Sequence, residues 1–151
     1  MAELSQSFKF KKNFRWQNIP VRKYKTSGTH FKNIVRQTIL PDDFPGADFS
    51  LRYFEIKAGG HSSLERHKHP HLILVVRGKG KVLIGSEIIS VKPMDCLLIA
   101  SQDWHQFQPV GKEPLGFLCL VHSKRDKPQL PSPKDLKLLQ KNKKIAKVIK
   151  L

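Results

Sequence analysis

Three histidines at alternate positions precede an apolar run of the chain. In the stretch ERHKHPHLILVVRG, Glu65 to Gly78, imidazoles stand at positions 67, 69 and 71. Side chains alternate across an extended chain, so His67, His69, His71 and Glu65 are expected on one face. Each buried imidazole needs partners for a donor and an acceptor, and a shared metal ion satisfies several rings at once. With a fourth ring from His105, the pattern predicts a metal centre with nitrogen ligands.

The spacing requires a bend. A straight strand separates residues 67 and 71 by about 13 Å, whereas ligand nitrogens on one ion lie about 3 to 3.5 Å apart. Pro70 cannot donate to a strand ladder and is typical of edges and bulges, so we expect the chain to bend there. His67 and His69 are then the pair of predicted metal ligands that does not depend on this bend, and Glu65 is an alternative carboxylate ligand.

Short apolar runs between proline- and glycine-rich loops predict the elements that position these rings. Seven runs have the length and the Val, Ile, Leu and Phe content of strands, and they are spaced as in an antiparallel sandwich or barrel. Gly85 and Ser86 predict a tight turn between two of them. The predicted fold class is all-β. The runs are FSLRYFEI, HLILVVRG, KVLIG, EIISV, CLLIA, HQFQP and GFLCLV.

The positive charge of the chain lies at its two ends. The formal net charge is +16, yet residues 38–122 hold nine basic and nine acidic residues. Residues 1–37 carry nine basic residues against one acid, and residues 123–151 carry ten against two. This division predicts one domain with a barrel over 38–122, a basic aromatic-rich extension before it and a basic tail after it. Nucleic acid is a partner that the flanks allow, but packing of the aromatic residues of 8–37 on the barrel or a neighbour is favoured.

The tail has the pattern of a basic amphipathic helix over 133–150. Ser132 is an N-cap residue, Pro133 suits the first helical position, and Asp135 follows three residues after the cap. Apolar residues gather on one half of the circumference, with most lysines opposite. This stripe is expected to dock on the barrel or on a second subunit. A homodimer is predicted because both faces of the run LILVVRG are apolar and the face away from the histidines needs a cover.

Other classes of protein are excluded or not indicated. No apolar run approaches the length of a membrane helix, and the first residues lack the apolar segment of a secretory signal. Cys96 and Cys119 lie in separate apolar runs, where buried free thiols are expected rather than a disulfide. A reducing cytoplasmic location fits this chain best.

The histidine region resembles the cupins, a family of small β-barrels. Their first motif runs Gly, five residues, His-x-His, three or four residues, Glu, six residues, Gly. Gly60, His67, His69 and Gly78 are recognisable, with Gly60 one residue further from His67 than the motif asks. His71 stands where the family has glutamate.

The second motif of the family ends in a histidine, which His105 matches. Met94, Ala100 and Gln102 replace its glycine, proline and glycine. The fifteen residues between Gly78 and Met94 match the compact spacing of small members. The resemblance covers about residues 50 to 122 and does not extend to the basic flanks.

The resemblance implies a cupin-like jelly-roll barrel with one divalent transition metal in its mouth. Nitrogen ligands favour iron, manganese, nickel, zinc or copper, and replacing a carboxylate by imidazole makes an anionic co-ligand welcome. The implied ligands are His67, His69, His71 and His105.

A metal in an open barrel implies a small-molecule substrate or ligand. By analogy, dioxygenase chemistry ranks ahead of isomerase chemistry. The alternatives are a noncatalytic regulatory module whose basic flanks contact an acidic partner or nucleic acid, and a barrel that has lost its ion. Candidate pocket residues, each of which could equally serve packing or lie in solvent, are Tyr53, Arg77, Trp104 and Phe107.

Overall fold

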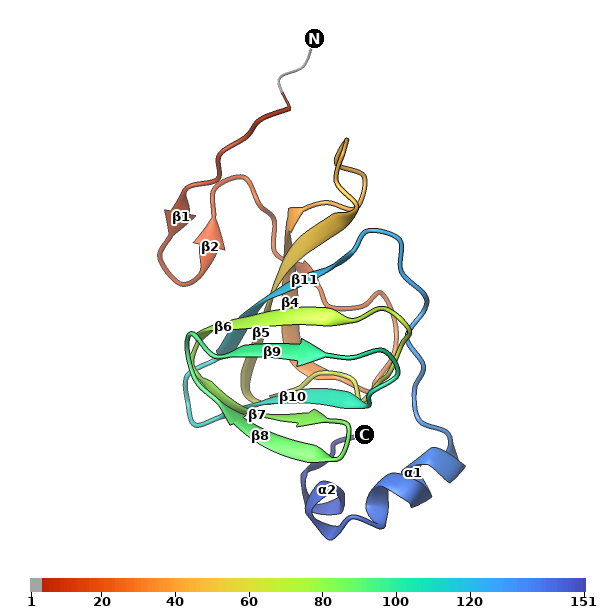
Figure 1. Ribbon diagram of the computed structural model, residues 1–151. Helices are drawn as coiled ribbons and strands as arrows, with labels where there is room; N and C mark the ends of the chain where they lie inside the picture. The colour runs from red at the N-terminus through yellow and green to blue at the C-terminus, as the bar shows by residue number, and fades with distance from the viewer. Residues whose placement is uncertain (1–3) are drawn as a thin grey trace.

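The computed structural model describes residues 4–151, which form two larger sheets packed together, a separate two-stranded hairpin and a short helical tail (Figure 1). The strands are β1 (Phe10–Lys11), β2 (Arg15–Trp16), β3 (Arg22–Lys23), β4 (Lys32–Leu40), β5 (Phe49–His61), β6 (His71–Arg77), β7 (Lys79–Ile84), β8 (Glu87–Val91), β9 (Cys96–Ile99), β10 (His105–Val110) and β11 (Leu115–His122). The helices are α1 (Pro133–Gln140) and α2 (Lys143–Val148).

The two sheets are antiparallel. Six strands form the larger sheet in the order β3-β4-β5-β11-β6-β9, and three form the smaller one in the order β10-β7-β8. The seven predicted runs correspond to β5 through β11, so the all-β prediction is confirmed. Apolar residues at alternate strand positions face the space between the sheets and form the main core. They include Ile34, Phe54, Ile56, Ile73, Val75, Val82, Phe107 and Phe117.

Two glycines are required by the backbone. Gly85 has φ +59° in the two-residue turn between β7 and β8, as its type predicts. Gly78 has φ +68°, and a Cβ there would overlap the carbonyl oxygen of Pro114. The glycine that closes the first cupin motif is therefore needed for the close approach of two loops.

The N-terminal extension contributes to the barrel rather than lying apart from it. β4 crosses the expected boundary between residues 37 and 38 and pairs with β5 along its length. The β1–β2 hairpin packs on the outer face of the larger sheet, where the ring of Phe14 stacks on Tyr53 at 5.9 Å and Trp16 meets it edge-on at 5.2 Å. The aromatic residues of the extension thus serve packing.

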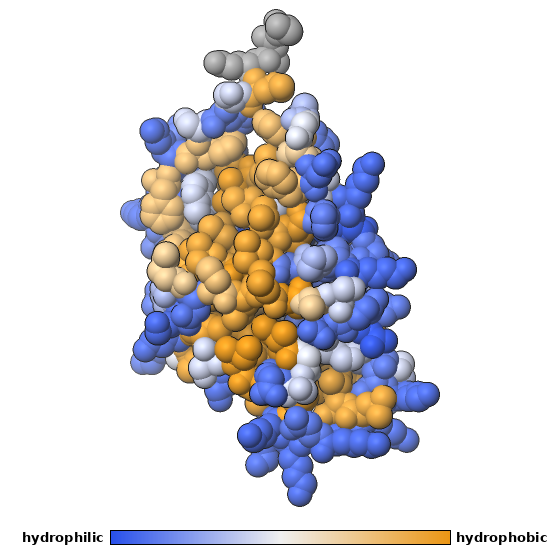
Figure 2. All heavy atoms as spheres, in the orientation of Figure 1, coloured by the Kyte–Doolittle hydropathy of each residue, from blue (hydrophilic) through white to orange (hydrophobic). Residues whose placement is uncertain are grey.

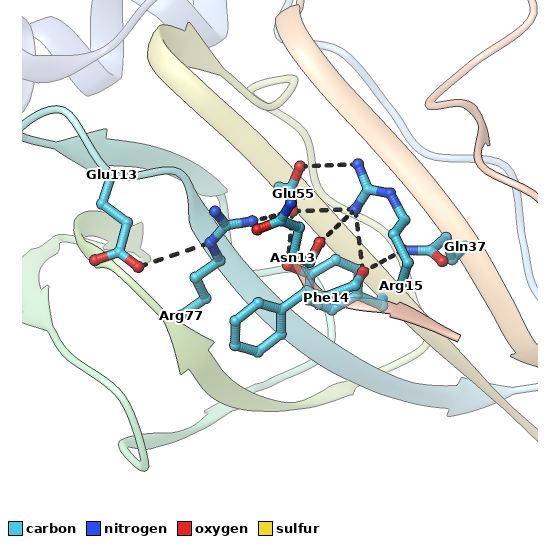
Figure 3. A network of polar contacts seen from close by, with 8 residues as sticks. Asn13, Phe14, Arg15, Gln37, Glu55, Arg77 and Glu113 are labelled. Atoms are coloured by element: carbon cyan, nitrogen blue, oxygen red, sulfur yellow. Dashed lines mark hydrogen bonds and ion pairs between the residues drawn. The ribbon is translucent and has the colours of Figure 1, made fainter. Parts of the chain in front are cut away.

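A buried carboxylate joins this hairpin to the sheet (Figure 3). Glu55 is 2% exposed and accepts hydrogen bonds from Arg77 at 2.8 Å, from the Tyr53 hydroxyl at 3.0 Å and from Arg15 at 3.3 Å. Three donors from three strands compensate the desolvation of the carboxylate, so Glu55 is a structural anchor.

The single helix expected over 133–150 is divided in two. Ser132 caps α1 through the predicted capping box with Asp135. The chain then leaves helical geometry at Asn142, whose side chain accepts hydrogen bonds from the backbone of Lys144 and Ile145 and begins α2. An asparagine that can bond to following backbone amides favours a cap over a helix interior, which explains the break.

The helices cover the outer face of the smaller sheet. Leu139 of α1 and Ile145 of α2 pack with Leu83 of β7 and with Leu64 in a second apolar cluster. The chain then returns along β10. The buried side chain of Gln106 donates to the carbonyl of Lys150 at 2.8 Å and accepts from its amide at 2.9 Å.

The outer face of β6 is not covered by the helices. Leu72 is 40% exposed, and Leu98 of the neighbouring β9 is 78% exposed. Figure 2 shows apolar side chains gathered across this side of the molecule. Cys119 is buried as expected, whereas Cys96 lies on this outer face and is exposed; neither forms a disulfide within the described chain. No helix of residues 4–151 combines the length and hydropathy that crossing a membrane would need.

Candidate metal centre

Four imidazole rings meet at one end of the space between the sheets. His67 and His69 lie on the loop before β6, His71 is the first residue of β6, and His105 is the first residue of β10. The ring centroid of His67 lies 3.6 Å from that of His69, 4.4 Å from His71 and 4.8 Å from His105. The structure therefore brings together all four predicted ligands from two separate parts of the chain.

The loop before β6 supplies the bend that the spacing required. Residues 66–70 are not in a strand, and β6 begins directly after Pro70. Glu65 and His105 form an antiparallel bridge with backbone bonds of 3.2 and 3.0 Å in the two directions. The amide of Gln102 donates to the carbonyl of His67 at 2.8 Å. These bonds join the first histidine segment to the second.

Two residues stand where the second cupin motif has glycine. Met94 has φ +77° and Gln102 has φ +67°, both in the left-handed region where the family pattern has glycine. A side chain there costs about 1 kcal/mol relative to glycine. Gln102 thus holds the carbonyl of His67 through its amide although it is not a glycine.

Each histidine uses its Nδ1 atom for a contact with the surrounding protein. Nδ1 of His67 lies 2.7 Å from the carbonyl of His69, and Nδ1 of His105 lies 2.9 Å from the carbonyl of Asp103. Nδ1 of His69 lies 2.8 Å from the Asp126 carboxylate, and Nδ1 of His71 lies 3.1 Å from Sγ of Cys119. All four partners can accept a hydrogen bond, which places the proton on Nδ1 and leaves Nε2 with a lone pair.

The Nε2 atoms of two rings face each other inside the cluster. Those of His67 and His71 are only 2.5 Å apart. Neutral rings with protonated Nδ1 atoms have no proton to share between such nitrogens, so a cation is the partner that satisfies them. The donor set therefore fits a divalent transition metal, and the four acceptors fix the orientation of its ligands.

The surroundings keep these rings neutral. Burial, followed by the nearby His105 and His69, lowers the pKa of His67 to about 4. Burial also lowers the pKa of His69, His71 and His105. Neutral imidazole is the form that binds metal, so the site is prepared for an ion across the neutral pH range.

Glu65 lies close enough to be considered as a fifth ligand. Two candidate sets of ligands have their ligand atoms within 4.8 Å of one another. One set is Glu65, His67 and His105, and the other is His67, His69 and His71. Glu65 also pairs with Lys25 at 2.5 Å. That pair competes with coordination by Glu65, so the four histidines stay the predicted ligand set.

The cluster opens into a cavity of about 250 Å³. The wall also holds residues that the sequence pattern did not assign to the pocket, among them Arg36, Arg52, Cys119 and Arg125. Strand alternation could have found two of them, since Arg52 shares the parity of the inward Phe54, and Cys119 that of the inward Phe117. Arg125 lies beyond the strands, where no such pattern applies.

One of the predicted pocket residues lines this cavity and three lie elsewhere. Phe107 is in the wall. Tyr53 has the opposite parity to Phe54 and faces the β1–β2 hairpin. Trp104 stacks against Arg66, whose guanidinium lies 4.5 Å from its ring, next to the helical tail.

The position of Arg77 results from a β-bulge. Val75 pairs with Phe117, but Arg77 pairs with Gly116, so Val76 is an extra residue on β6. The bulge reverses the alternation that would have placed Arg77 on the side of His71. Its guanidinium therefore bonds Glu55 on the outer face of the sheet (Figure 3).

The chain is similar in sequence and in structure to several known proteins. The family model for the cupin domain matches residues 52–121. A 1-methylthio-D-xylulose 5-phosphate methylsulfurylase of Rhodospirillum rubrum is 40% identical over 132 residues, which cover 87% of this chain and 83% of that protein. The crystal structure of a cupin 2 conserved barrel domain protein from Rhodopseudomonas palustris shares 37% identity at a TM-score of 0.91 and covers 97% of this chain and 100% of that one. The structure of a cupin-2 domain protein of Rhodospirillum rubrum shares 39% identity at a TM-score of 0.83 over 91% of each chain.

Proposed function

The chain belongs to the cupin superfamily, and on this premise we propose that it is a metal-dependent enzyme that removes the methylthio group from a 1-methylthio ketose phosphate. The observation that carries the proposal is a cavity in which a four-histidine centre and a buried thiol lie side by side. The 40% identity to a protein named as a methylsulfurylase of such a substrate supports the reaction type.

The four histidines would hold the ion through Nε2. A bound divalent ion would supply a Lewis acid beside the ketone oxygen of the substrate. The protein itself orients the ligands through their Nδ1 contacts, and Phe54, Phe107 and Phe117 limit water at the inner wall of the cavity.

Cys119 is the thiol that the cavity offers to the substrate sulfur. Its Sγ lies 3.1 Å from Nδ1 of His71 and 3.7 Å from Nη2 of Arg52. Burial raises the pKa of the Cys119 thiol, while the hydrogen bond and positive charge of Arg52 oppose this rise and favour the thiolate. A buried thiol is thus held next to the predicted metal ligands, with Arg52 as the group that stabilises its thiolate form.

The proposed transfer is balanced in atoms and electrons. The sulfur of Cys119 bonds to the methylthio sulfur, the bond from that sulfur to C1 breaks with its electron pair on C1, and the thiol proton ends on C1. The products are a methyl ketone and a Cys119 methyl disulfide. A low-molecular-weight thiol then exchanges with this disulfide, which frees Cys119 and carries the methylthio group away.

The test is turnover of 1-methylthio-D-xylulose 5-phosphate by protein loaded in turn with iron, manganese, nickel, zinc or copper, with a thiol present. Proton NMR should show a new methyl ketone signal. Without the thiol, mass spectrometry should show one added methylthio group on the protein. Absence of product with every metal would refute the function, and oxygen uptake in its place would support the dioxygenase prediction.

The two cysteines of the chain provide a matched pair of variants. Cys119→Ser should lose turnover and the protein adduct while keeping bound metal. Cys96→Ser, which changes an exposed thiol on the outer face of β9, should keep turnover, the protein adduct and the bound metal. Turnover by Cys119→Ser at the wild-type rate would remove the thiol from the mechanism.

A homodimer remains part of the proposal. The exposed leucines of β6 and β9 form an apolar face that a second copy would cover. Light scattering with size separation tests it, and Leu98→Lys should convert a dimer into a monomer if this face is the interface.

A further inference from the structure

We propose that Arg36 and Arg52 form an anion subsite in the metal cavity that binds the phosphate of the substrate and so sets its direction. This inference rests on the proposed function, since it names the part of the cavity that recognises a phosphorylated ligand. It begins from the Nε atoms of Arg36 and Arg52, which are both buried without a hydrogen-bond partner.

Both arginines project from the larger sheet toward the interior. Arg36 of β4 pairs in register with the inward Phe54 of β5, and Arg52 pairs with Thr38. Both line the same cavity as the four histidines. The guanidinium of Arg52 lies 5.0 Å from the ring of Phe54, which holds it in place.

The other charged groups of the cavity already have partners, and the carboxylate of Asp126 accepts hydrogen bonds from the amides of Lys68 and His69 and from the His69 ring. Lys25 bonds Glu65 at 2.5 Å. Arg125 makes a two-pronged contact with Asp42, at 2.6 and 2.8 Å. The cavity therefore has no free carboxylate among these groups to neutralise Arg36 and Arg52.

The two remaining arginines lack such compensation. Within residues 4–151, neither takes part in an ion pair, and the Nε atoms of both are buried without a hydrogen-bond partner. Burial and the neighbouring positive charges of Arg52, Arg22 and Arg125 lower the pKa of Arg36. Keeping two guanidinium groups near each other is unfavourable unless an anion joins them.

A phosphate monoester matches this arrangement in charge and geometry. Its two negative charges balance two guanidinium groups, and its oxygens accept the paired N–H bonds that arginine presents. Arg52 also reaches Cys119 through Nη2. A ketose phosphate held at the arginines would leave its unphosphorylated end to the rest of the cavity, which the thiol and the histidines also line.

Inorganic phosphate binding to metal-free protein tests the subsite without the ion or the reaction. Calorimetry on chelator-treated protein should show that Arg36→Met weakens phosphate binding by at least about tenfold, since bonds to charged groups contribute that much. Arg36→Lys should restore part of the affinity. Lys57→Met, which removes one charge from an exposed lysine of β5, should bind phosphate as the wild type does.

Three outcomes would overturn the subsite. They are equal phosphate binding by the wild type and Arg36→Met, no phosphate binding by the wild type, and acetate competing as well as phosphate. Arg52→Gln provides a second variant if Arg36→Met does not fold, as judged by its circular dichroism. This assay needs neither metal nor turnover. Phosphate binding can therefore be found even if the proposed reaction fails, and the reaction can be found even if the phosphate subsite fails.

Discussion

Replacing Asp126 by asparagine should weaken metal binding although Asp126 is not itself a predicted ligand. Its Oδ1 accepts from Nδ1 of His69 at 2.8 Å and from the His69 amide at 3.2 Å, and its Oδ2 accepts from the Lys68 amide at 2.8 Å. These hydrogen bonds hold the pKa of Asp126 well below its usual range, so it is a carboxylate at neutral pH. It therefore sets both the backbone and the ring orientation of His69.

The size of the loss follows from this role. Removing a partner of a metal-bound imidazole costs about 10- to 100-fold in affinity, which is about 1.4 to 2.7 kcal/mol. Asparagine keeps one carbonyl oxygen but turns an NH₂ group toward an N–H donor. We expect the larger part of this range because one of three hydrogen bonds must then be lost.

Competition with a coloured chelator measures the affinity, using the metal that the purified protein retains. His69→Ala should lose more affinity than Asp126→Asn because it removes a ligand. Asp43→Asn, at an exposed acid outside the cavity wall, is the control and should match the wild type. Affinity within twofold of the wild type in Asp126→Asn would refute the reasoning, since His69 would then need no orientation by the carboxylate.

Three further predictions concern stability. Glu55→Gln should lower the free energy of unfolding by about 3 kcal/mol, because it leaves the buried Arg77 without its carboxylate; urea unfolding measures it, and a change below about 1 kcal/mol would contradict the anchor role. In metal-free protein the pKa of His67 is about 4, below the ordinary 6.5, so the unfolded state binds more protons between these values. Stability should be full above pH 6.5 and fall as the pH drops toward 4, and a urea midpoint that stays constant over this range would be inconsistent with a buried neutral ring. Leu139→Ala should lower the free energy of unfolding by about 2 kcal/mol, because it leaves a cavity in the apolar cluster under α1. Metal affinity should stay unchanged, and a loss of metal affinity alongside the loss of stability would show that the helix supports the metal centre.

Strand alternation accounts for much of what could be predicted from the sequence. The apolar runs became β5 to β11 because their alternate residues face a shared core. The same periodicity indicated that His67, His69 and His71 belong together, although the rings meet through a bent loop rather than along a strand. A local pattern was sufficient here because the site lies at the start of a strand whose register the core sets.

The errors arise where alternation is interrupted or where contacts are distant in sequence. The bulge at Val76 moved Arg77 to the other face, and no local pattern marks such an insertion. Arg36 enters the cavity only because β4 pairs with β5, a pairing that the assignment of residues 1–37 to an extension concealed. Asp126 reaches His69 across 57 positions, a separation that one sequence cannot reveal.

The bonds between Gln106 and Lys150 have a practical consequence for how the protein is handled. Gln106 directly follows His105 on β10, so the last residues of the chain are fastened beside a predicted ligand. A purification tag fused after Leu151 would begin two residues after Lys150, and a polyhistidine tag there would bring competing imidazoles near the barrel. Tags are better placed before residue 4, or removed by a protease before any metal content is assayed.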